Sequence, residues 1–158
     1  LEFTRTIMWL RRDHPVLRRR RFFTGDAGHG GESELGEIEW LTPAGESMTD
    51  QDWTTWYARA MMVFLNGEAI AEPDERGQRI VDDSFLVLIN ASDEDITFTL
   101  PGEGYAPTWK VALDTAPAVD GDSDPVLAAD DTVVVEARSM LFIIDAPESA
   151  ATTERHPR

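Results

Sequence analysis

The sequence contains no cysteine among its 158 residues. This absence excludes a disulfide framework, a thiolate metal site and a cysteine nucleophile, because each of them needs a thiol. It fits a protein of the reducing cytoplasm, which is the location we expect. The sequence also lacks a hydrophobic run of the roughly 20 residues that a membrane-spanning helix needs, so we expect no membrane partner.

The chain has no initiator methionine and no signal peptide, and it opens at Leu1. We therefore expect it to be a piece of a longer protein. A chain of this length can bury about 68–70% of its unfolded surface, so it can form a stable core without crosslinks.

Positive charge is scarce and unevenly placed. The formal net charge is −16 at pH 7, yet seven arginines fall within residues 1–21, where only Glu2 and Asp13 oppose them. An acidic body repels nucleic acid and anionic membranes. The four arginines Arg18–Arg21 could still form a nucleic-acid arm. Hydrophobic residues flank them on both sides, and arginine stems cover apolar surface, so we expect this segment to pack on protein and to bind no nucleic acid.

Hydrophobic periodicity predicts one helix followed by strands. Phe3, Ile7 and Leu10 share one face of a helix over residues 1–13, which Pro15 ends. Strands are expected at residues 38–41, 60–65, 85–89, 96–100, 109–113, 132–136 and 139–144. Several short strands with frequent turn signals predict a mainly β fold, an antiparallel β-sandwich preceded by one N-terminal helix.

Shorter motifs predict the connections between these strands. Thr49 and Asp52 have the spacing of a capping box, so a short helical turn is expected there. Asn66-Gly67 signals a tight hairpin turn after strand 60–65. Residues 72–79 and 119–131 are expected to form polar loops.

Two segments resemble ligand-binding loops. Asp120–Asp124 matches the beginning of a calcium loop, but Pro125 stands where the sharp turn needs glycine, and Asp131 replaces the usual glutamate. We therefore expect an exposed acidic loop and no calcium. The glycines of residues 25–36 are followed by no Lys-Ser or Lys-Thr, so they predict a connection and not a phosphate cradle.

Histidines and paired carboxylates are weaker candidates. His14, His29 and His156 lack the spacing of a helical metal site, so we expect no metal and no cofactor. Asp82-Asp83 and the acidic residues of 72–75 could perform acid–base catalysis. Aspartate is common in turns, however, and we expect a structural role for all of them.

Tryptophans suggest a further kind of site. Trp40, Trp53, Trp56 and Trp109 could form a platform on which sugar rings stack. Packing in a core or an interface is the more frequent use of tryptophan, so both interpretations stay open.

One family combines these features. The segment WLTPAGESMTDQDW, with LRRDHPVLRRRRFFTG before it and VFLNGEAI and DDSFLVLINAS after it, resembles the C-terminal end of bacterial glycogen debranching enzymes. These enzymes are of the isoamylase type, within the α-amylase superfamily of glycoside hydrolases. The resemblance covers residues 1–144. Ala44 stands where aspartate usually precedes the glycine, and Glu37 stands where aspartate is common.

The resemblance implies a division of the chain. Residues 1–14 would be the last helix of an upstream (β/α)₈ barrel, and residues 15–37 a basic segment and glycine-rich connection. Residues 38–147 would be the C-terminal β-sandwich, and residues 148–158 a disordered tail. The family's three catalytic carboxylates lie on the barrel, so no catalytic residue is carried over. The resemblance implies a non-catalytic, inactive piece that stabilises and orients the barrel of an enzyme hydrolysing α-1,6 branch linkages in glycogen or limit dextrin.

The resemblance also places the tryptophan segment near the seam between barrel and sandwich. The candidate seam residues are Trp40, Trp53, Phe22 and Phe23. The candidate carbohydrate contacts are Trp56 and Trp109. The alternative function is therefore a carbohydrate-binding module that contacts α-glucan. Expected partners are the upstream barrel of the same chain and, through the parent enzyme, the α-glucan substrate; a homodimer formed through the exposed first helix is the other candidate.

Overall fold

A computed structural model describes residues 1–20, 23, 35–55, 59–116 and 126–146. The described part begins with helix α1 (Glu2–Asp13) and the 3-10 turn η1 (Pro15–Arg18). A second, short helix, α2 (Asp50–Thr54), follows the first strand. The strands are β1 (Ile38–Leu41), β2 (Ala60–Leu65), β3 (Phe85–Asn90), β4 (Ile96–Thr99), β5 (Thr108–Asp114), β6 (Val126–Ala128), β7 (Thr132–Val135) and β8 (Ser139–Asp145).

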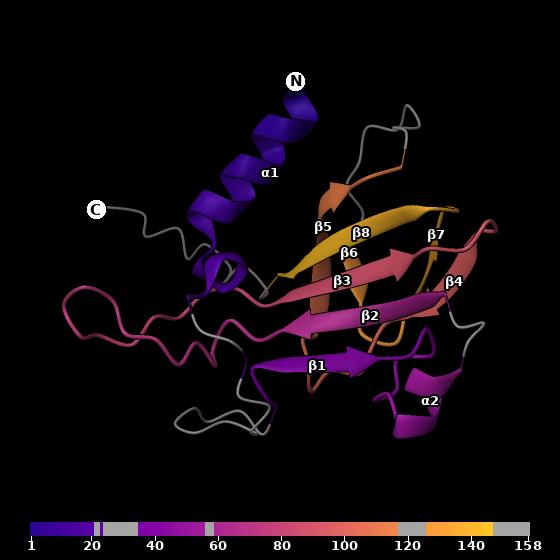
Figure 1. The fold of residues 1–158 in the computed structure, drawn as a ribbon, viewed down its shortest axis with the longest axis horizontal. Helices are drawn as coiled ribbons and strands as arrows, with labels where there is room; N and C mark the ends of the chain where they lie inside the picture. Colours follow the sequence, from indigo (N-terminus) through magenta and orange to yellow (C-terminus); the bar gives the residue numbers. More distant parts are fainter. Residues whose placement is uncertain (21–22, 24–34, 56–58, 117–125, 147–158) are drawn as a thin grey trace, which may run out of the picture.

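The strands form two antiparallel sheets. Six of them are ordered β1-β2-β3-β8-β5-β6, and β4 pairs with β7 in a separate two-stranded sheet. Figure 1 shows the small sheet behind the large one and α1 rising away from it near the start of β3. The predicted mainly β fold with one N-terminal helix is confirmed. No helix within the described residues is both long and apolar enough to cross a membrane.

The large sheet is apolar on both faces. One face packs on the two-stranded sheet, and the buried members of this main core include Leu41, Met62, Phe64, Leu86, Leu88, Phe98, Leu100, Trp109, Val135, Leu141 and Ile143. The opposite face packs on the N-terminal segment, where Phe85 lies in a smaller cluster with Leu10, Val16 and Ile70. This arrangement explains why β3 has no polar alternation, as expected for a strand covered on both sides.

The predicted tight turn at Asn66-Gly67 is wrong. Strands β2 and β3 do pair, with Leu65 opposite Phe85, but residues 66–84 connect them. The Asn66 side chain turns inward and is buried, and its Oδ1 accepts a hydrogen bond from the Glu68 N–H. Gly67 is needed for a close approach, because a Cβ there would lie 2.1 Å from the carbonyl oxygen of Asp82.

The acidic loop expected over residues 119–131 contains an unpredicted strand. Strand β6 is only three residues long, with exposed Val126 and Ala128, so it carries too little hydrophobic pattern to be recognised. It forms by pairing with the first three residues of β5. The rest of the proposed calcium loop, residues 120–125, lies outside the described residues.

Candidate functional site

Trp40 lies on the face of the large sheet that carries the N-terminal segment. In β1 the neighbouring residue Leu41 points into the main core, so Trp40 points to the opposite side. The register confirms this, because Trp40 pairs with Val63, Val63 with Val87, and Val87 is two residues from Phe85. The Trp40 side chain is 39% exposed. A large aromatic side chain therefore remains partly in water on this face.

A tight turn brings Trp53 onto Trp40. The backbone folds back after β1, where the N–H of Met48 donates to the carbonyl oxygen of Trp40 at 2.8 Å. Gly45 in this turn has a φ of +84°, which favours glycine. The rings of Trp40 and Trp53 meet edge to face, with centroids 5.3 Å apart. Trp53 is 51% exposed, so the pair forms an aromatic surface that we call the tryptophan pair.

The predicted capping box holds helix α2, which carries Trp53. The Thr49 N–H donates to Asp52 Oδ2 at 2.8 Å, and its hydroxyl donates to the same oxygen at 2.7 Å. The backbone bond and then the hydroxyl bond lower the pKa of Asp52, since both stabilise its charged form. A capped first turn fixes the direction of a helix only five residues long.

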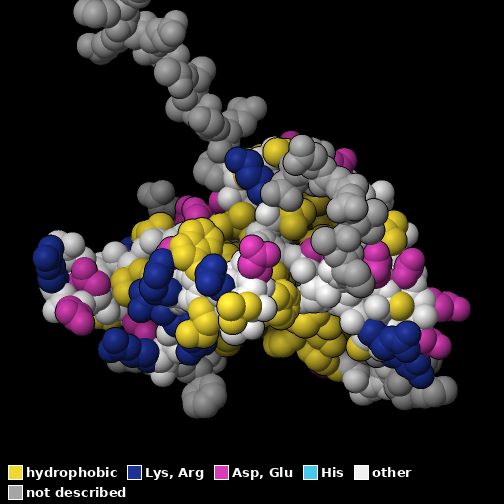
Figure 2. All heavy atoms as spheres, turned by 90° about the horizontal axis from the view of Figure 1, so that it is seen from above, with side chains coloured by type: hydrophobic (Ala, Val, Ile, Leu, Met, Phe, Trp, Pro, Cys, Tyr) yellow, Lys and Arg dark blue, Asp and Glu magenta, His cyan; other side chains and the backbone are white. Residues whose placement is uncertain are grey.

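Helix α1 exposes most of its hydrophobic side chains. Among its residues only Leu10 is buried. Phe3 and Trp9 are each 49% exposed, and Ile7 and Met8 are exposed as well. Figure 2 shows hydrophobic side chains on the helix and in a hollow beside it, between groups of basic side chains. Helix α1 and the tryptophan pair thus each expose large hydrophobic side chains.

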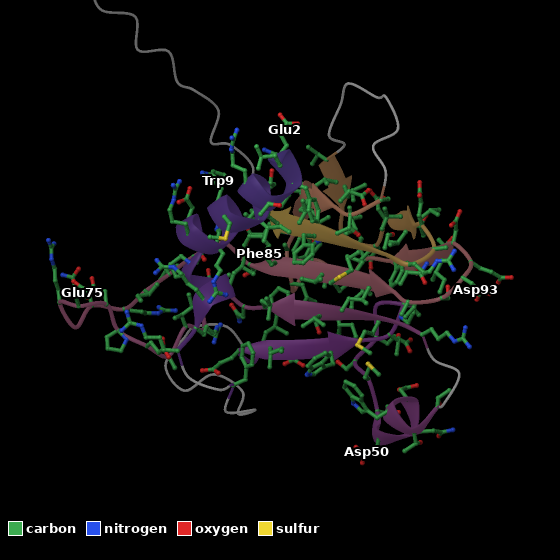
Figure 3. All side chains as sticks on the ribbon, turned by 45° about the horizontal axis from the view of Figure 1, so that its top comes forward. Glu2, Trp9, Asp50, Glu75, Phe85 and Asp93 are labelled. Carbon is green, nitrogen blue, oxygen red and sulfur yellow. The ribbon has the colours of Figure 1, made fainter. Side chains whose placement is uncertain are left out.

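The C-terminal end of α1 is attached by one carboxylate. Asp82, just before β3, accepts hydrogen bonds on Oδ1 from His14 Nδ1 and on Oδ2 from the Val16 N–H, both at 2.9 Å. Its Oδ1 also accepts from the Asp83 N–H at 2.9 Å. The His14 ring meets Phe85 edge to face at 4.9 Å, and Figure 3 shows Phe85 beneath the helix that bears Trp9. The Asp82 and His14 side chains are only 8% and 13% exposed.

Arg19 makes a second attachment between the basic segment and the domain. Its guanidinium donates to the carbonyl oxygen of Asn66 at 2.8 Å and lies 3.6 Å from the Glu37 carboxylate. The guanidinium also lies 5.0 Å from the ring centre of Phe23, a cation–π distance. Burial lowers the pKa of Arg19, while the charges of Glu37 and Glu72 act in the opposite direction. Within the arginine segment, Arg19 therefore packs on the domain, Arg18 and Arg20 are exposed, and Arg21 lies outside the described residues.

His14, Asp82 and Asp83 form the one cluster among the described residues whose ligand atoms lie within 4.8 Å of one another, as in a metal site. The spacing of the three histidines along the sequence gives no sign of this grouping, because His14 meets Asp82 and Asp83 only in the folded chain. Both oxygens of Asp82 already accept hydrogen bonds. A metal ion would have to replace those bonds, so the cluster fits a structural clamp better than a metal centre.

Two of the other carboxylates proposed for acid–base work, Glu72 and Asp74, accept hydrogen bonds from backbone N–H groups. Glu72 accepts from the Arg20 N–H, and Asp74 Oδ1 accepts from the N–H groups of Arg76 and Gln78. Burial is the largest cause that raises the pKa of Asp145, and neighbouring carboxylates raise it further. The partners of Glu72 and Asp74 are backbone N–H groups, which fits a structural role for these two carboxylates.

The proposed carbohydrate contact at Trp109 needs correction. Trp109 is fully buried in the main core, so no face of its ring is open to a sugar. Alternation in β5 identified the strand but not which of its faces is covered.

The seam candidate Phe23 is 38% exposed. The other two candidates, Phe22 and Trp56, lie outside the described residues, as do His29, His156 and the glycines of residues 25–31.

Comparison with known proteins gives a consistent result. Residues 37–146 match the family model described as "Isoamylase, C-terminal". Over 143 residues the chain is 50% identical to proteins called "Glycogen operon protein GlgX homolog" in Mycobacterium bovis and in two strains of Mycobacterium tuberculosis. The match covers 90% of this chain but only 20% of each relative. The chain thus spans about one fifth of the length of these relatives.

Proposed function

This chain belongs to the family of isoamylase C-terminal domains, and from that premise we propose that it is the non-catalytic β-sandwich of a cytoplasmic glycogen debranching enzyme. The parent enzyme would hydrolyse α-1,6 linkages at the branch points of glycogen or limit dextrin. The domain would hold and orient the catalytic barrel of the same chain. The name of the mycobacterial relatives, which refers to the glycogen operon, supports the substrate class.

The observation that carries the proposal is the exposed apolar side of the domain. The tryptophan pair and helix α1 lie on the same face of the large sheet, opposite the main core. A large aromatic side chain buries about 150–250 Å², so leaving several of them in water is unfavourable unless another surface covers them. The matched 143 residues make up only 20% of the mycobacterial relatives, and in this proposal the rest of such a chain would supply the covering surface.

The proposal assigns two parts of this surface. Residues 1–14 would be the last helix of the barrel, and its exposed residues Phe3, Ile7 and Trp9 would face that barrel. The tryptophan pair would lie at the seam where barrel and sandwich meet. No residue of the described part is proposed to act in the chemical step, since the family's catalytic carboxylates lie on the barrel.

Binding in trans tests the seam. A mycobacterial relative lacking the matched 143 residues would be titrated by calorimetry with this chain and with the double variant Trp40→Ser/Trp53→Ser. We expect the double variant to bind at least about tenfold more weakly, because buried aromatic anchors dominate interfaces. The control is Val134→Ser, which is 60% exposed on the two-stranded sheet and should bind like the unchanged chain. Equal binding by the double variant would contradict a seam at the tryptophan pair.

Two further measurements separate the remaining interpretations. The chain alone should release no reducing ends from glycogen, and activity that scales with its concentration would contradict a non-catalytic role. Analytical ultracentrifugation of the chain alone tests whether a second copy covers the tryptophan pair. A dimer that the double variant Trp40→Ser/Trp53→Ser abolishes would show that this surface serves self-association.

The half-exposed tryptophan pair also supports the second candidate, a module that binds α-glucan, because sugar rings stack on such aromatic faces. Co-sedimentation with glycogen distinguishes the two. Retention of the chain, lost in Trp40→Ser/Trp53→Ser and kept in Val134→Ser, would favour the glucan module.

A further inference from the structure

Helix α1 has little to fix its direction except its last turn. Leu10 is its only buried residue, and residues 1–5 and 7–9 are all exposed. The helix ends at His14, whose backbone is extended ahead of Pro15, so the chain changes direction there. Whatever sets the angle between α1 and the sheet must therefore act close to residues 10–16.

Asp82 is the group at that position. One oxygen of its carboxylate is hydrogen-bonded to the His14 ring, and the other accepts a hydrogen bond from the Val16 N–H. Asp82 therefore binds the chain on both sides of Pro15. Because an ionised carboxylate can only accept hydrogen bonds, the Nδ1–H of His14 is the donor. Asp82 itself is held beside the end of β2, since its N–H donates at 3.1 Å to the carbonyl oxygen of Gly67, two positions after that strand.

The partners lie far apart in the sequence but next to the central strand. His14 and Asp82 are separated by 68 positions, and Asp82 lies only three positions before Phe85, the first residue of β3. The His14 ring also rests on Phe85, the first residue of β3. A charge-assisted hydrogen bond between largely buried side chains is among the stronger polar contacts in a protein. This pair can therefore hold helix α1, which has few other contacts with the domain.

We propose that the His14–Asp82 hydrogen bond is a clamp that fixes the direction of α1 on the sandwich. The clamp is a property of this chain alone. Its consequence rests on the proposed function: if α1 is the last helix of the catalytic barrel, His14 and Asp82 are positioning residues that set the angle between barrel and sandwich.

Two substitutions at His14 separate the hydrogen bond from ring packing. His14→Phe keeps a ring against Phe85 but removes the Nδ1 donor. His14→Asn loses the ring but places an amide donor near the position of Nδ1. A clamp made by the hydrogen bond should fail in His14→Phe and survive in His14→Asn, whereas simple packing predicts the reverse.

Spin-label distances measure the helix direction directly, and the absence of cysteine makes each introduced label unique. One label is placed at Arg5→Cys on α1 and the other at Val134→Cys on β7, both exposed positions. Arg5 lies nine residues before His14, an arm of about 13 Å, so a tilt of roughly 30° moves it by about 7 Å. A second pair, Val126→Cys and Val134→Cys, reports on the sandwich alone.

The unchanged chain and His14→Asn should give one narrow distance distribution between Arg5→Cys and Val134→Cys. His14→Phe and Asp82→Ala should give a distribution that is broadened or shifted by several ångströms, while the Val126–Val134 pair stays the same. A narrow, unshifted distribution in His14→Phe would overturn the proposal. A broad distribution in His14→Asn would also overturn it, because it would show that packing of the His14 ring fixes the helix. A changed Val126–Val134 distance would overturn it as well, because it would show that Asp82 stabilises the sandwich itself. None of these outcomes depends on the binding test of the tryptophan pair.

Discussion

Removing helix α1 should leave the sandwich folded, at a cost that the structure allows to be worked out. Only Leu10 of the helix is buried, at 5% exposure, in the cluster with Val16 and Phe85. Burying a leucine side chain contributes about 1.5–3 kcal/mol to stability. An isolated helix of this length is marginal in water, so the helical backbone adds little of its own. Deleting residues 1–13 should therefore lower the free energy of unfolding by about 1.5–3 kcal/mol, a minority of the roughly 5–15 kcal/mol typical of a domain.

Two truncations make this prediction sharp. Deleting residues 1–9 keeps Leu10 and should change the free energy of unfolding by less than about 1 kcal/mol, because every side chain removed except Thr6 is exposed. Deleting residues 1–13 and substituting Leu10→Ala both remove the buried leucine side chain, so their costs should agree where the two estimates overlap, at about 2–3 kcal/mol. Urea unfolding followed by far-UV circular dichroism measures all three. A loss above about 5 kcal/mol on deleting residues 1–13, or a large loss on deleting residues 1–9, would show that α1 belongs to the sandwich core.

Three further substitutions test the core, the close approach and the acidic end of β8. Leu88→Ala, at a fully buried position, should lower the free energy of unfolding by about 2–5 kcal/mol in a urea titration. Gly67→Ala should be clearly destabilising in thermal melts, because its Cβ would meet two backbone carbonyl oxygens within 2.4 Å, whereas Gly104→Ala has open space and should not. The pKa of Asp145 is raised, so its ionised form opposes folding. Asp145→Asn should therefore stabilise the domain above the raised pKa, with the gain fading as the pH falls through it, in melts from pH 3 to 8.

The strands could be predicted because each carries its own pattern. The uninterrupted apolar run of β3 and the alternation in β4 and β5 depend on neighbours within a few residues, which a sequence displays. The capping box was equally local. Strand β6 was not predicted, because a strand of three residues, two of them exposed, is too short to show a hydrophobic pattern.

The contacts that build the candidate site could not be predicted, because they join distant parts of the chain. Nothing near His14 signals that Asp82 will meet it, and the hydrogen bond exists only once β3 is in place. Gly67 was misread for the same reason, since its lack of a Cβ serves the approach of Asp82 and not a turn. Trp109 shows a further limit: alternation gives the two faces of a strand without saying which one the second sheet covers.

The position of Trp40 follows from the register of β1 against β2, and its neighbour Leu41 fixes that register. Successive residues of a strand point to opposite faces, so slipping β1 by one residue would bury Trp40 and expose Leu41. Leu41 is fully buried beside Met62 and Leu88, and that packing fixes the register against β2. Trp40 is thereby turned to the face that bears α1, where it meets Trp53 edge to face and stays 39% exposed. The same leucine that secures the core therefore presents the tryptophan pair outward. A Leu41→Ala variant should destabilise the sandwich and also weaken its binding to the proposed upstream barrel. If such a variant, at temperatures where it remains folded, bound the proposed barrel as tightly as the unchanged chain, the dependence of this surface on the register of β1 would be refuted.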